Sequence, residues 1–376
     1  MIRILQNIGT LANGGMESFL LNIYRNIDRN QIQFDFVIGS YNNWNKNYAD
    51  EIERLGGHIY HIPSGLKGIY PFYRILKAHP EYQIVHSHRD AMSALFLFAA
   101  KKAGVAHRLA HSHSAGETGF VKHIGTILLR PLLNSVSTLR LACGLEAGQH
   151  LFGSHNFITI PNAIDLNIYQ YQPKFSQQKR EEIGFNTSDI IFGHVGRFIN
   201  VKNHAFLIDI FQQIHLKNNN AKLLLIGDGE RKSEIKQKIT RLSLDDSVLI
   251  LSNRSDVNEL LQTMNMVIFP SFYEGFSMAM VEMQASGLRI LCSDQVPKEI
   301  NITGNVVFKS INDSAEEWAK EALNLLKYNR DSHNSITLLT QAGLDIHQSA
   351  QNIQNMYLDL SKITGDNNLA NKQYKR

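Results

Sequence analysis

The chain has 376 residues, of which 43% are hydrophobic and 19% charged, and its formal net charge at pH 7 is +4. This is the composition of a globular protein, and the length exceeds what one hydrophobic core usually organises, so we expect two domains. The mild positive charge argues against a nucleic-acid-binding protein and is compatible with weak attraction to an anionic membrane surface.

The two cysteines, Cys143 and Cys292, lie far apart in apolar runs. This placement predicts buried free thiols and a reducing compartment. The opening MIRILQNIG has no long apolar stretch, so we expect no signal peptide. The sequence contains no run of ~20 apolar residues, so we expect no membrane-spanning helix.

Strand-like and helix-like segments alternate through the first half of the chain. The expected strands are residues 2–8, 34–38, 58–62, 83–87 and 108–112. The expected helices are residues 16–27, 48–56, 70–79, 90–104 and 123–134. This alternation predicts a parallel sheet with helices on both faces.

The alternation restarts after a strand at 157–165, which ends in a Pro-Asn turn. The polar stretch 167–189 is interpreted as an interdomain linker followed by a helix that leads into the second domain. Further strands are expected at 190–196, 222–229, 247–251, 266–270 and 288–293, and helices at 205–215, 230–242, 314–328 and 347–363. We therefore predict an α/β protein with two doubly wound domains, 1–165 and 166–345, and a ligand cleft at the carboxyl ends of their strands. The polar tail 363–376 is expected to be disordered.

The loop GTLANGGMESF (9–19) places Gly14 and Gly15 between a strand and a helix. Paired glycines allow a close backbone approach, and free N–H groups at a helix N-terminus suit a phosphate. The loop lacks both the G-x-G-x-x-G spacing and the P-loop pattern, so a plain strand–helix turn remains an alternative.

Two cations follow the strand 190–196, namely Arg197 and Lys202, just before a helix. Arginine can bind a phosphate through two hydrogen bonds and lysine adds a point charge, so a phosphate site is favoured over two solvated loop cations. Gly227 and Gly229 in IGDG indicate a tight turn, with a supporting role in the cleft as a further option.

In EGFSMAMVE (274–282), two acids border an apolar segment. Glu274 is expected in a loop, and Glu282 in the second turn of a helix that begins near Ser277. Backbone N–H groups near Phe276, Ser277 and Met278 would face a ligand at the helix N-terminus. Carboxylates accept hydrogen bonds from sugar or ribose hydroxyls, and the rival use is the acid/base pair of a glycoside hydrolase.

The tripeptide HSH occurs twice, at 86–88 and 111–113. The first continues into an H-x-H-x-D pattern of His86, His88 and Asp90, which could hold a metal. No downstream ligand that would complete the set is evident in the sequence, so we expect no metal there. His113 ends a predicted strand, where it could contact a substrate hydroxyl or shuttle a proton, or be structural.

Taken together, these motifs resemble the retaining GT-B glycosyltransferases of family 4. The resemblance rests on GGME, IPNAID (160–165), the pair Arg197 and Lys202, and EGFS followed by Glu282, and it spans roughly residues 1–362. The opening GGMESFLLNIYRNIDRNQIQFDFVI is similar to bacterial exopolysaccharide and capsule glycosyltransferases. Ala163 stands where the family more often has glycine, which puts little in doubt.

The resemblance implies a GT-B fold, with the helix 346–362 crossing back to the N-terminal, acceptor-binding domain, and a nucleotide-sugar donor bound without a metal or other cofactor. Arg197 and Lys202 would neutralise the donor diphosphate, and Gly14 and Gly15 would close over it. The other implied contacts are Glu282 with the ribose, Glu274 with the transferred sugar, His113 at the anomeric centre, Gly275, Phe276, Ser277 and Met278 with phosphate and sugar, and Asn253 and Arg254 with the base.

The acceptor is less defined. Residues 121–134 mix basic and apolar side chains, which suits a helix lying on a membrane surface, and packing against the sheet is the alternative. On the first interpretation the acceptor is a polyprenyl-diphosphate-linked saccharide at the cytoplasmic face of the membrane.

A hexosyltransferase using a UDP-sugar is the leading hypothesis. The alternatives are a nucleotide-sugar epimerase of the same fold, a non-catalytic sugar-nucleotide-binding partner of another transferase, and a metallohydrolase built on HSHRD.

Overall fold

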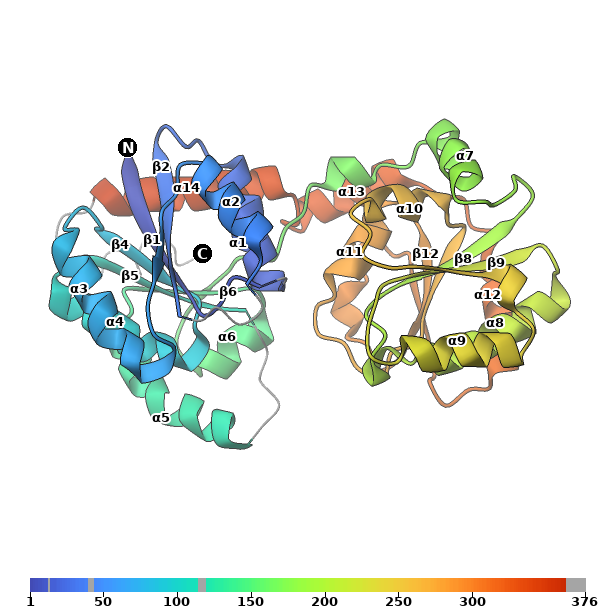
Figure 1. The fold of residues 1–376 in the computed structure, drawn as a ribbon, viewed down its shortest axis with the longest axis horizontal. Helices are drawn as coiled ribbons and strands as arrows, with labels where there is room; N and C mark the ends of the chain where they lie inside the picture. Colours follow the sequence, from blue (N-terminus) through green and yellow to red (C-terminus); the bar gives the residue numbers. More distant parts are fainter. Residues whose placement is uncertain (13, 40–43, 114–119, 363–376) are drawn as a thin grey trace. The chain divides into compact units, whose positions relative to one another are not determined.

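The computed structural model describes residues 1–12, 14–39, 44–113 and 120–362 (Figure 1). The chain forms two compact units, one of Met1–Ile164 with the chain from Gly343 onward, the other of Asp165–Ala342. Each unit is built on a parallel β-sheet with helices around it, which confirms the predicted α/β class. Among the described helices, none combines the length and apolar character needed to cross a membrane.

The described residues of the first unit form a seven-stranded sheet in the order β3-β2-β1-β4-β5-β6-β7. The chain adds β2 and β3 on one side of β1 and then returns to add β4 to β7 on the other, so the strand order reverses between β1 and β4. The strands are β1 (Ile2–Ile8), β2 (Ile32–Ile38), β3 (Ile59–His61), β4 (Ile84–Ser87), β5 (His107–Ser112), β6 (Leu139–Ala142) and β7 (Ile158–Thr159).

Helices cover both faces of this sheet because alternate strand residues point to opposite sides. Ile4 and Ile8 of β1 join one buried apolar cluster, whereas Leu5 joins the other. The helices are α1 (Gly15–Asn26), α2 (Lys46–Arg54), α3 (Ile69–Ala78), α4 (Ser93–Ala103), α5 (Phe120–Val136), α6 (Leu145–Phe152) and α14 (Ile346–Lys362).

The last helix, α14, packs on the first unit, as the family resemblance implied. Its residues Ile353, Met356 and Tyr357 are buried in the same cluster as β1 and α1. The Gln354 Oε1 atom accepts a 2.7 Å hydrogen bond from the Asp28 backbone N–H. Apolar burial and this polar contact together hold the C-terminal helix against the first sheet.

The second unit has a six-stranded parallel sheet in the order β10-β9-β8-β11-β12-β13, as far as its described residues go. The strand order reverses between β8 and β11. Its strands are β8 (Ile190–Val195), β9 (Ala221–Ile226), β10 (Val248–Leu251), β11 (Met266–Phe269), β12 (Arg289–Ser293) and β13 (Val306–Lys309). Its helices are α7 (Pro173–Glu182), α8 (His204–Lys217), α9 (Lys232–Arg241), α10 (Val257–Thr263), α11 (Met278–Ala285), α12 (Ala315–Leu325) and α13 (Ser332–Gln341).

Residues 167–189 pack as part of this second unit and do not form a linker, and the helix expected within them is α7. Leu166 is fully buried, and Tyr169 and Phe185 are each 8% exposed. Lys179 of α7 pairs with Glu182, Asp256 and Glu259 at 3.0, 2.8 and 2.9 Å. The segment is polar, so its few apolar anchors and its ion pairs were not recognised as packing.

Several short elements were also missed, namely β6, α6, α10, β13 and α13. Within the expected strand at 157–165, only Ile158–Thr159 form a strand, and Ile164 makes an isolated parallel bridge with Asp345. Cys292 is buried and Cys143 is partly exposed, and both thiols are free. The tail 363–376 lies outside the described residues.

Candidate functional site

Two loops emerge at the point where the strand order of the second unit reverses. One follows β8 and carries Arg197 and Lys202, and the other follows β11 and carries Glu274. Adjacent parallel strands end at the same sheet edge, which is where doubly wound proteins bind ligands. The Phe272 N–H donates to the Val201 carbonyl at 2.8 Å, so the two loops are joined directly.

Lys202 and Glu274 form an ion pair within this site. The Lys202 Nζ atom lies 2.7 and 2.9 Å from the two carboxylate oxygens of Glu274, and 4.9 Å from the centre of the Phe269 ring. The two side chains are only 15% and 10% exposed. The family resemblance implied that Lys202 contacts the diphosphate and Glu274 the sugar, whereas here the two side chains bind each other. The lysine ammonium still has a third N–H that can donate to a ligand.

Arg197 is exposed in the first of these loops. The IGDG turn packs against the backbone on either side of it, at Gly196 and Phe198. Gly227 and Gly229 have φ angles of +152° and +156°, which other residues rarely adopt. A Cβ atom on Gly227 would lie 2.1 Å from the Gly196 carbonyl oxygen. The turn therefore also sets the path of the Arg197 backbone, beyond the tight turn that the sequence indicated.

Gly227→Ala is expected to destabilise the protein by about 3 kcal/mol, because the methyl group clashes with backbone that cannot rotate away. Gly184→Ala is the matched control, since Gly184 has a φ of +86° but open space around it, and should cost only about 1 kcal/mol. Urea unfolding of both variants measures the difference. Equal losses would show that backbone conformation alone, without the close approach, explains these glycines.

Glu274 and Glu282 stand where the sequence placed them. Ser277 is the N-cap of α11, Glu274 lies in the loop before it, and Glu282 lies in the second turn. Burial raises the pKa of Glu282 to about 7, although a hydrogen bond from the Tyr169 hydroxyl lowers it. Tyr169 was not anticipated as a site residue, because it lies far upstream in a stretch that looked like a linker.

The N-terminus of α11 offers unpaired amides to a ligand. Among the described residues, none accepts a hydrogen bond from the backbone N–H of Phe276, Ser277 or Met278, and Gly275 has open space beside its Cα. The flanking aromatic rings of Phe272, Tyr273 and Phe276 are 48%, 63% and 46% exposed. Free helix N–H groups favour an anion, and exposed rings offer stacking surfaces.

The predicted base-binding residues lie further along the same sheet. Asn253 and Arg254 follow β10, which β9 and β8 separate from β11. Asn253 adopts a left-handed φ of +53°, and Arg254 Nε donates to Asp256 at 2.7 Å. Arg254 is thus held by a neighbouring carboxylate.

In the first unit, Gly14 is the N-cap of α1 and Gly15 is its first residue. The carboxylate of Glu17 occupies the space beside Gly14, where a Cβ atom would meet its Oε2 at 2.3 Å. Thr10 Oγ1 and the Ala12 N–H donate to this carboxylate at 3.2 and 3.4 Å. A negative charge thus lies beside the proposed phosphate loop, a feature that the glycine pattern did not reveal.

The two HSH motifs come together because β4 and β5 are neighbours. His86, His88, His111 and His113 form one cluster, with ring centres 4.1 Å apart within each motif and 5.2 Å between His86 and His111. His86, His88 and His111 are arranged so that a metal ion could be held. The sequence analysis found no downstream partner for the first motif, whereas the fold places His111 beside it.

Hydrogen bonds determine which nitrogen of His88 carries its proton. The Gln6 amide nitrogen donates to the Tyr357 hydroxyl at 3.3 Å, and its Oε1 lies 2.9 Å from His88 Nε2. That oxygen only accepts, so His88 Nε2 is protonated and its Nδ1 lone pair accepts from His113 Nε2 at 2.7 Å. Burial lowers the pKa of His113 to about 3, so His113 is neutral at physiological pH.

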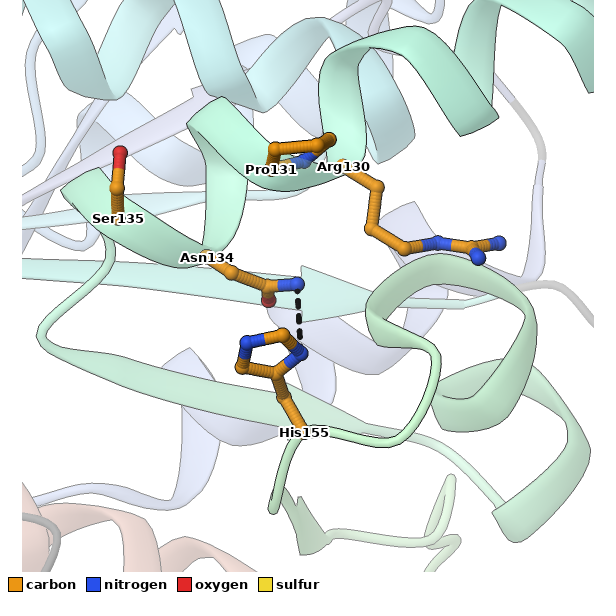
Figure 2. A pocket seen from close by; sticks show the side chains of 5 residues that line it. All are labelled: Arg130, Pro131, Asn134, Ser135 and His155. Atoms are coloured by element: carbon orange, nitrogen blue, oxygen red, sulfur yellow. Dashed lines mark hydrogen bonds between the residues drawn. The ribbon is translucent and has the colours of Figure 1, made fainter.

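A separate surface pocket lies on the first unit and contains none of these residues. Arg130, Pro131, Asn134, Ser135 and His155 line it, and Figure 2 shows Asn134 and His155 in contact. The Asn134 Nδ2 atom lies 3.1 Å from His155 Nδ1.

Comparisons with known proteins agree with this architecture. The family described as "Glycosyl transferases group 1" matches residues 175–337. A Bacillus subtilis (strain 168) protein named as glycosyltransferase EpsF is 31% identical over 370 residues, covering 94% of this chain and 96% of its own. The Staphylococcus aureus capsular polysaccharide biosynthesis glycosyltransferase CapH is 22% identical over 368 residues, covering 95% and 99%.

The crystal structure of Anabaena Alr3699/HepE in complex with UDP superposes with a TM-score of 0.75 at 19% identity, covering 96% of this chain and 100% of that one. This likeness confirms the GT-B fold. Together with the full-length match to the Bacillus subtilis protein, it shows that the chain belongs to the group 1 glycosyl transferases, as a relative of enzymes of exopolysaccharide and capsule type.

Proposed function

We propose that the protein is a retaining, metal-independent glycosyltransferase that moves a hexose from a UDP-sugar to a saccharide acceptor in exopolysaccharide or capsule synthesis. The observation that carries the proposal is the ion pair of Lys202 with Glu274 at the switch point of the second sheet. The loop after β8 also carries the exposed Arg197, and the loop of Glu274 leads into the N-terminus of α11.

This arrangement suits a donor diphosphate. Departure of the nucleotide places negative charge on the diphosphate, and preorganised cations and amides stabilise that charge most in the transition state. Arg197 has no ion-pair partner among the described residues, and Lys202 retains an N–H for a phosphate oxygen. With these groups in place, no metal is needed at the diphosphate.

The donor hydroxyls would be held by carboxylates. Glu282 would accept from the ribose and Glu274 from the transferred sugar. The structure of the Anabaena protein with UDP supports a uridine nucleotide. The name of an Escherichia coli relative, UDP-Gal:alpha-D-GlcNAc-diphosphoundecaprenol alpha-1,3-galactosyltransferase, supports both a UDP-hexose and a lipid-linked acceptor, and it is 26% identical over 64% of this chain and 63% of its own.

Retention would follow a front-face route through an oxocarbenium-like state, without an enzyme nucleophile. In this route His113 acts as a neutral hydrogen-bonding group at the sugar, since its pKa of about 3 means that the imidazolium form is absent at neutral pH.

Helix α5 supports an acceptor at the cytoplasmic membrane surface. Its Leu133 and Val136 are buried against the sheet, but Ile124, Ile127 and Leu128 are 40%, 47% and 72% exposed. One face of the helix therefore packs in the core, and the other presents an apolar strip that supports a membrane-facing role.

A two-step experiment tests the function. A thermal-shift screen against nucleotide sugars should find a UDP-sugar that stabilises the protein. That donor should then release UDP only when a polyprenyl-diphosphate saccharide is added, with product of unchanged anomeric configuration and full activity in EDTA. Strict dependence on added Mg²⁺ or Mn²⁺ would count against metal-independent transfer. Donor interconversion without acceptor would identify an epimerase, and binding without turnover a partner subunit.

A further inference from the structure

We propose that His86, His88 and His111 of the first unit form a binding site for a borderline divalent transition-metal ion, with Zn²⁺ the best match. The site lies at the carboxyl ends of β4 and β5, and its three histidines have no role in the proposed transfer reaction.

The first argument is a group of buried nitrogen atoms that have no partner. Within the described part of the chain, His86 Nε2, both ring nitrogens of His111, and His113 Nδ1 are buried without a hydrogen bond. A buried polar atom left unsatisfied costs roughly 1–3 kcal/mol. Four such atoms in one cluster indicate that a ligand belongs there.

The second argument is geometry. One ligand nitrogen from each of His86, His88 and His111 lies within 4.8 Å of the others, and all three residues are buried. Zn²⁺ binds imidazole nitrogen at about 2.0–2.1 Å, which places ligands roughly 3.4 Å apart in a tetrahedron. Small ring rotations inward would close the set around an ion.

The third argument is the pattern of outer contacts. Metal-bound histidines usually engage their second ring nitrogen in a hydrogen bond that orients the ring. His88 Nε2 contacts Gln6 Oε1 at 2.9 Å, and His86 Nδ1 contacts the Tyr357 hydroxyl at 2.6 Å. In both residues this leaves the other nitrogen, His88 Nδ1 and His86 Nε2, to face the ion.

The ligand type selects the class of metal. Three neutral imidazoles suit Zn²⁺, Ni²⁺, Co²⁺ or Cu²⁺, whereas Mg²⁺ and Ca²⁺ require oxygen ligands. Three protein ligands also leave a fourth tetrahedral position for water.

Metal binding has a consequence for His113, which rests on the proposed function. The His88 Nδ1 lone pair that would bind the ion is the one that accepts the hydrogen bond from His113. The ion therefore releases His113 from its partner and should slow transfer, and EDTA should restore it. This is consistent with a reaction that needs no metal.

The test measures metal retention, independently of activity. The full-length chain, purified with a tag that contains no histidine, is incubated with excess Zn²⁺, passed through a desalting column and analysed for bound metal. We expect one Zn²⁺ per chain for the wild type and less than a tenth of that for His111→Ala and for His86→Gln. His333→Ala, at an exposed histidine of α13, is the matched control and should retain one.

Co²⁺ substitution supplies a second readout, because tetrahedral nitrogen ligation gives visible absorption bands that His111→Ala should abolish. Circular dichroism and unfolding curves of both variants show whether they fold, and Zn²⁺ should raise the melting temperature of the wild type only. Failure of the wild type to retain Zn²⁺, or retention that survives in folded His111→Ala, would overturn the site. Either result leaves the transferase proposal intact, since that is tested by UDP release in EDTA.

Discussion

Glu282→Gln is expected to weaken binding of the UDP-sugar donor roughly 10- to 100-fold at pH 8. A carboxylate that accepts from two ribose hydroxyls makes charge-assisted hydrogen bonds worth about 1.5–3 kcal/mol, whereas glutamine offers one neutral acceptor. Calorimetric titration of donor into wild type and variant measures the change. Glu299→Gln, at an exposed acid of the same unit, should bind as the wild type does.

The same side chain should make donor affinity depend on pH. The pKa of Glu282 in the free protein is about 7, so below pH 7 it is mostly protonated and must lose its proton to accept both hydroxyls. Affinity should therefore rise as pH increases through about 7, and fall up to tenfold per pH unit below it. The stability of the free protein has the opposite pH dependence. Folding raises the pKa of this carboxyl, so the stability that it contributes is lost as the pH rises from its pKa in the unfolded chain toward 7.

Glu282→Gln should flatten this pH profile, because the amide does not titrate. A wild-type affinity that is constant between pH 5.5 and 8, or a variant that binds as tightly as the wild type, would remove Glu282 from the donor site.

Lys202→Met is expected to destabilise the protein by about 3 kcal/mol and to lower the rate of transfer roughly 100- to 1000-fold. The stability loss arises because removal of the ammonium leaves the Glu274 carboxylate, only 10% exposed, without its partner. The loss of rate arises because a preorganised cation at the departing diphosphate is removed. Urea unfolding and UDP release measure the two effects separately.

A double variant separates the two roles of Lys202. Lys202→Met combined with Glu274→Gln should recover most of the stability, since no buried charge remains, but not the rate. Lys217→Met is the surface control, because Lys217 and its partner Glu316 are 40% and 70% exposed, and it should change stability by less than about 1 kcal/mol. A stable, fully active Lys202→Met enzyme would refute the assigned roles.

Most of the fold could be predicted from the sequence because its elements are locally encoded. The runs Leu223–Ile226 of β9 and Met266–Phe269 of β11 are continuously apolar and buried, as expected of strands covered on both faces. The order of strands and helices then required two doubly wound sheets. Short elements with weak local patterns escaped, such as β6 and α6. The packing of α7 also escaped, because its Lys179 pairs with Asp256 and Glu259, which lie far away in the chain.

The residues proposed to bind the donor could also be selected from the sequence, because glycines, cations and acids at strand ends are conspicuous. The positions of Glu274 before α11 and of Glu282 within it followed from the predicted helix start alone. Local sequence patterns could not predict which side chains pair with each other, because a salt bridge or a hydrogen bond between distant segments depends on how the chain packs. Lys202 with Glu274, and Glu282 with Tyr169, are of this kind.

The sequence by itself determined the α/β class, the family and the segments that form the candidate site, since these depend on short-range patterns. Only the tertiary structure decided how the two HSH motifs are used. They lie on separate strands, and the parallel pairing of β4 with β5 brings their rings together. Burial then leaves His86 and His111 with unpaired nitrogens, so two motifs that look incomplete as metal sites become one complete set of ligands.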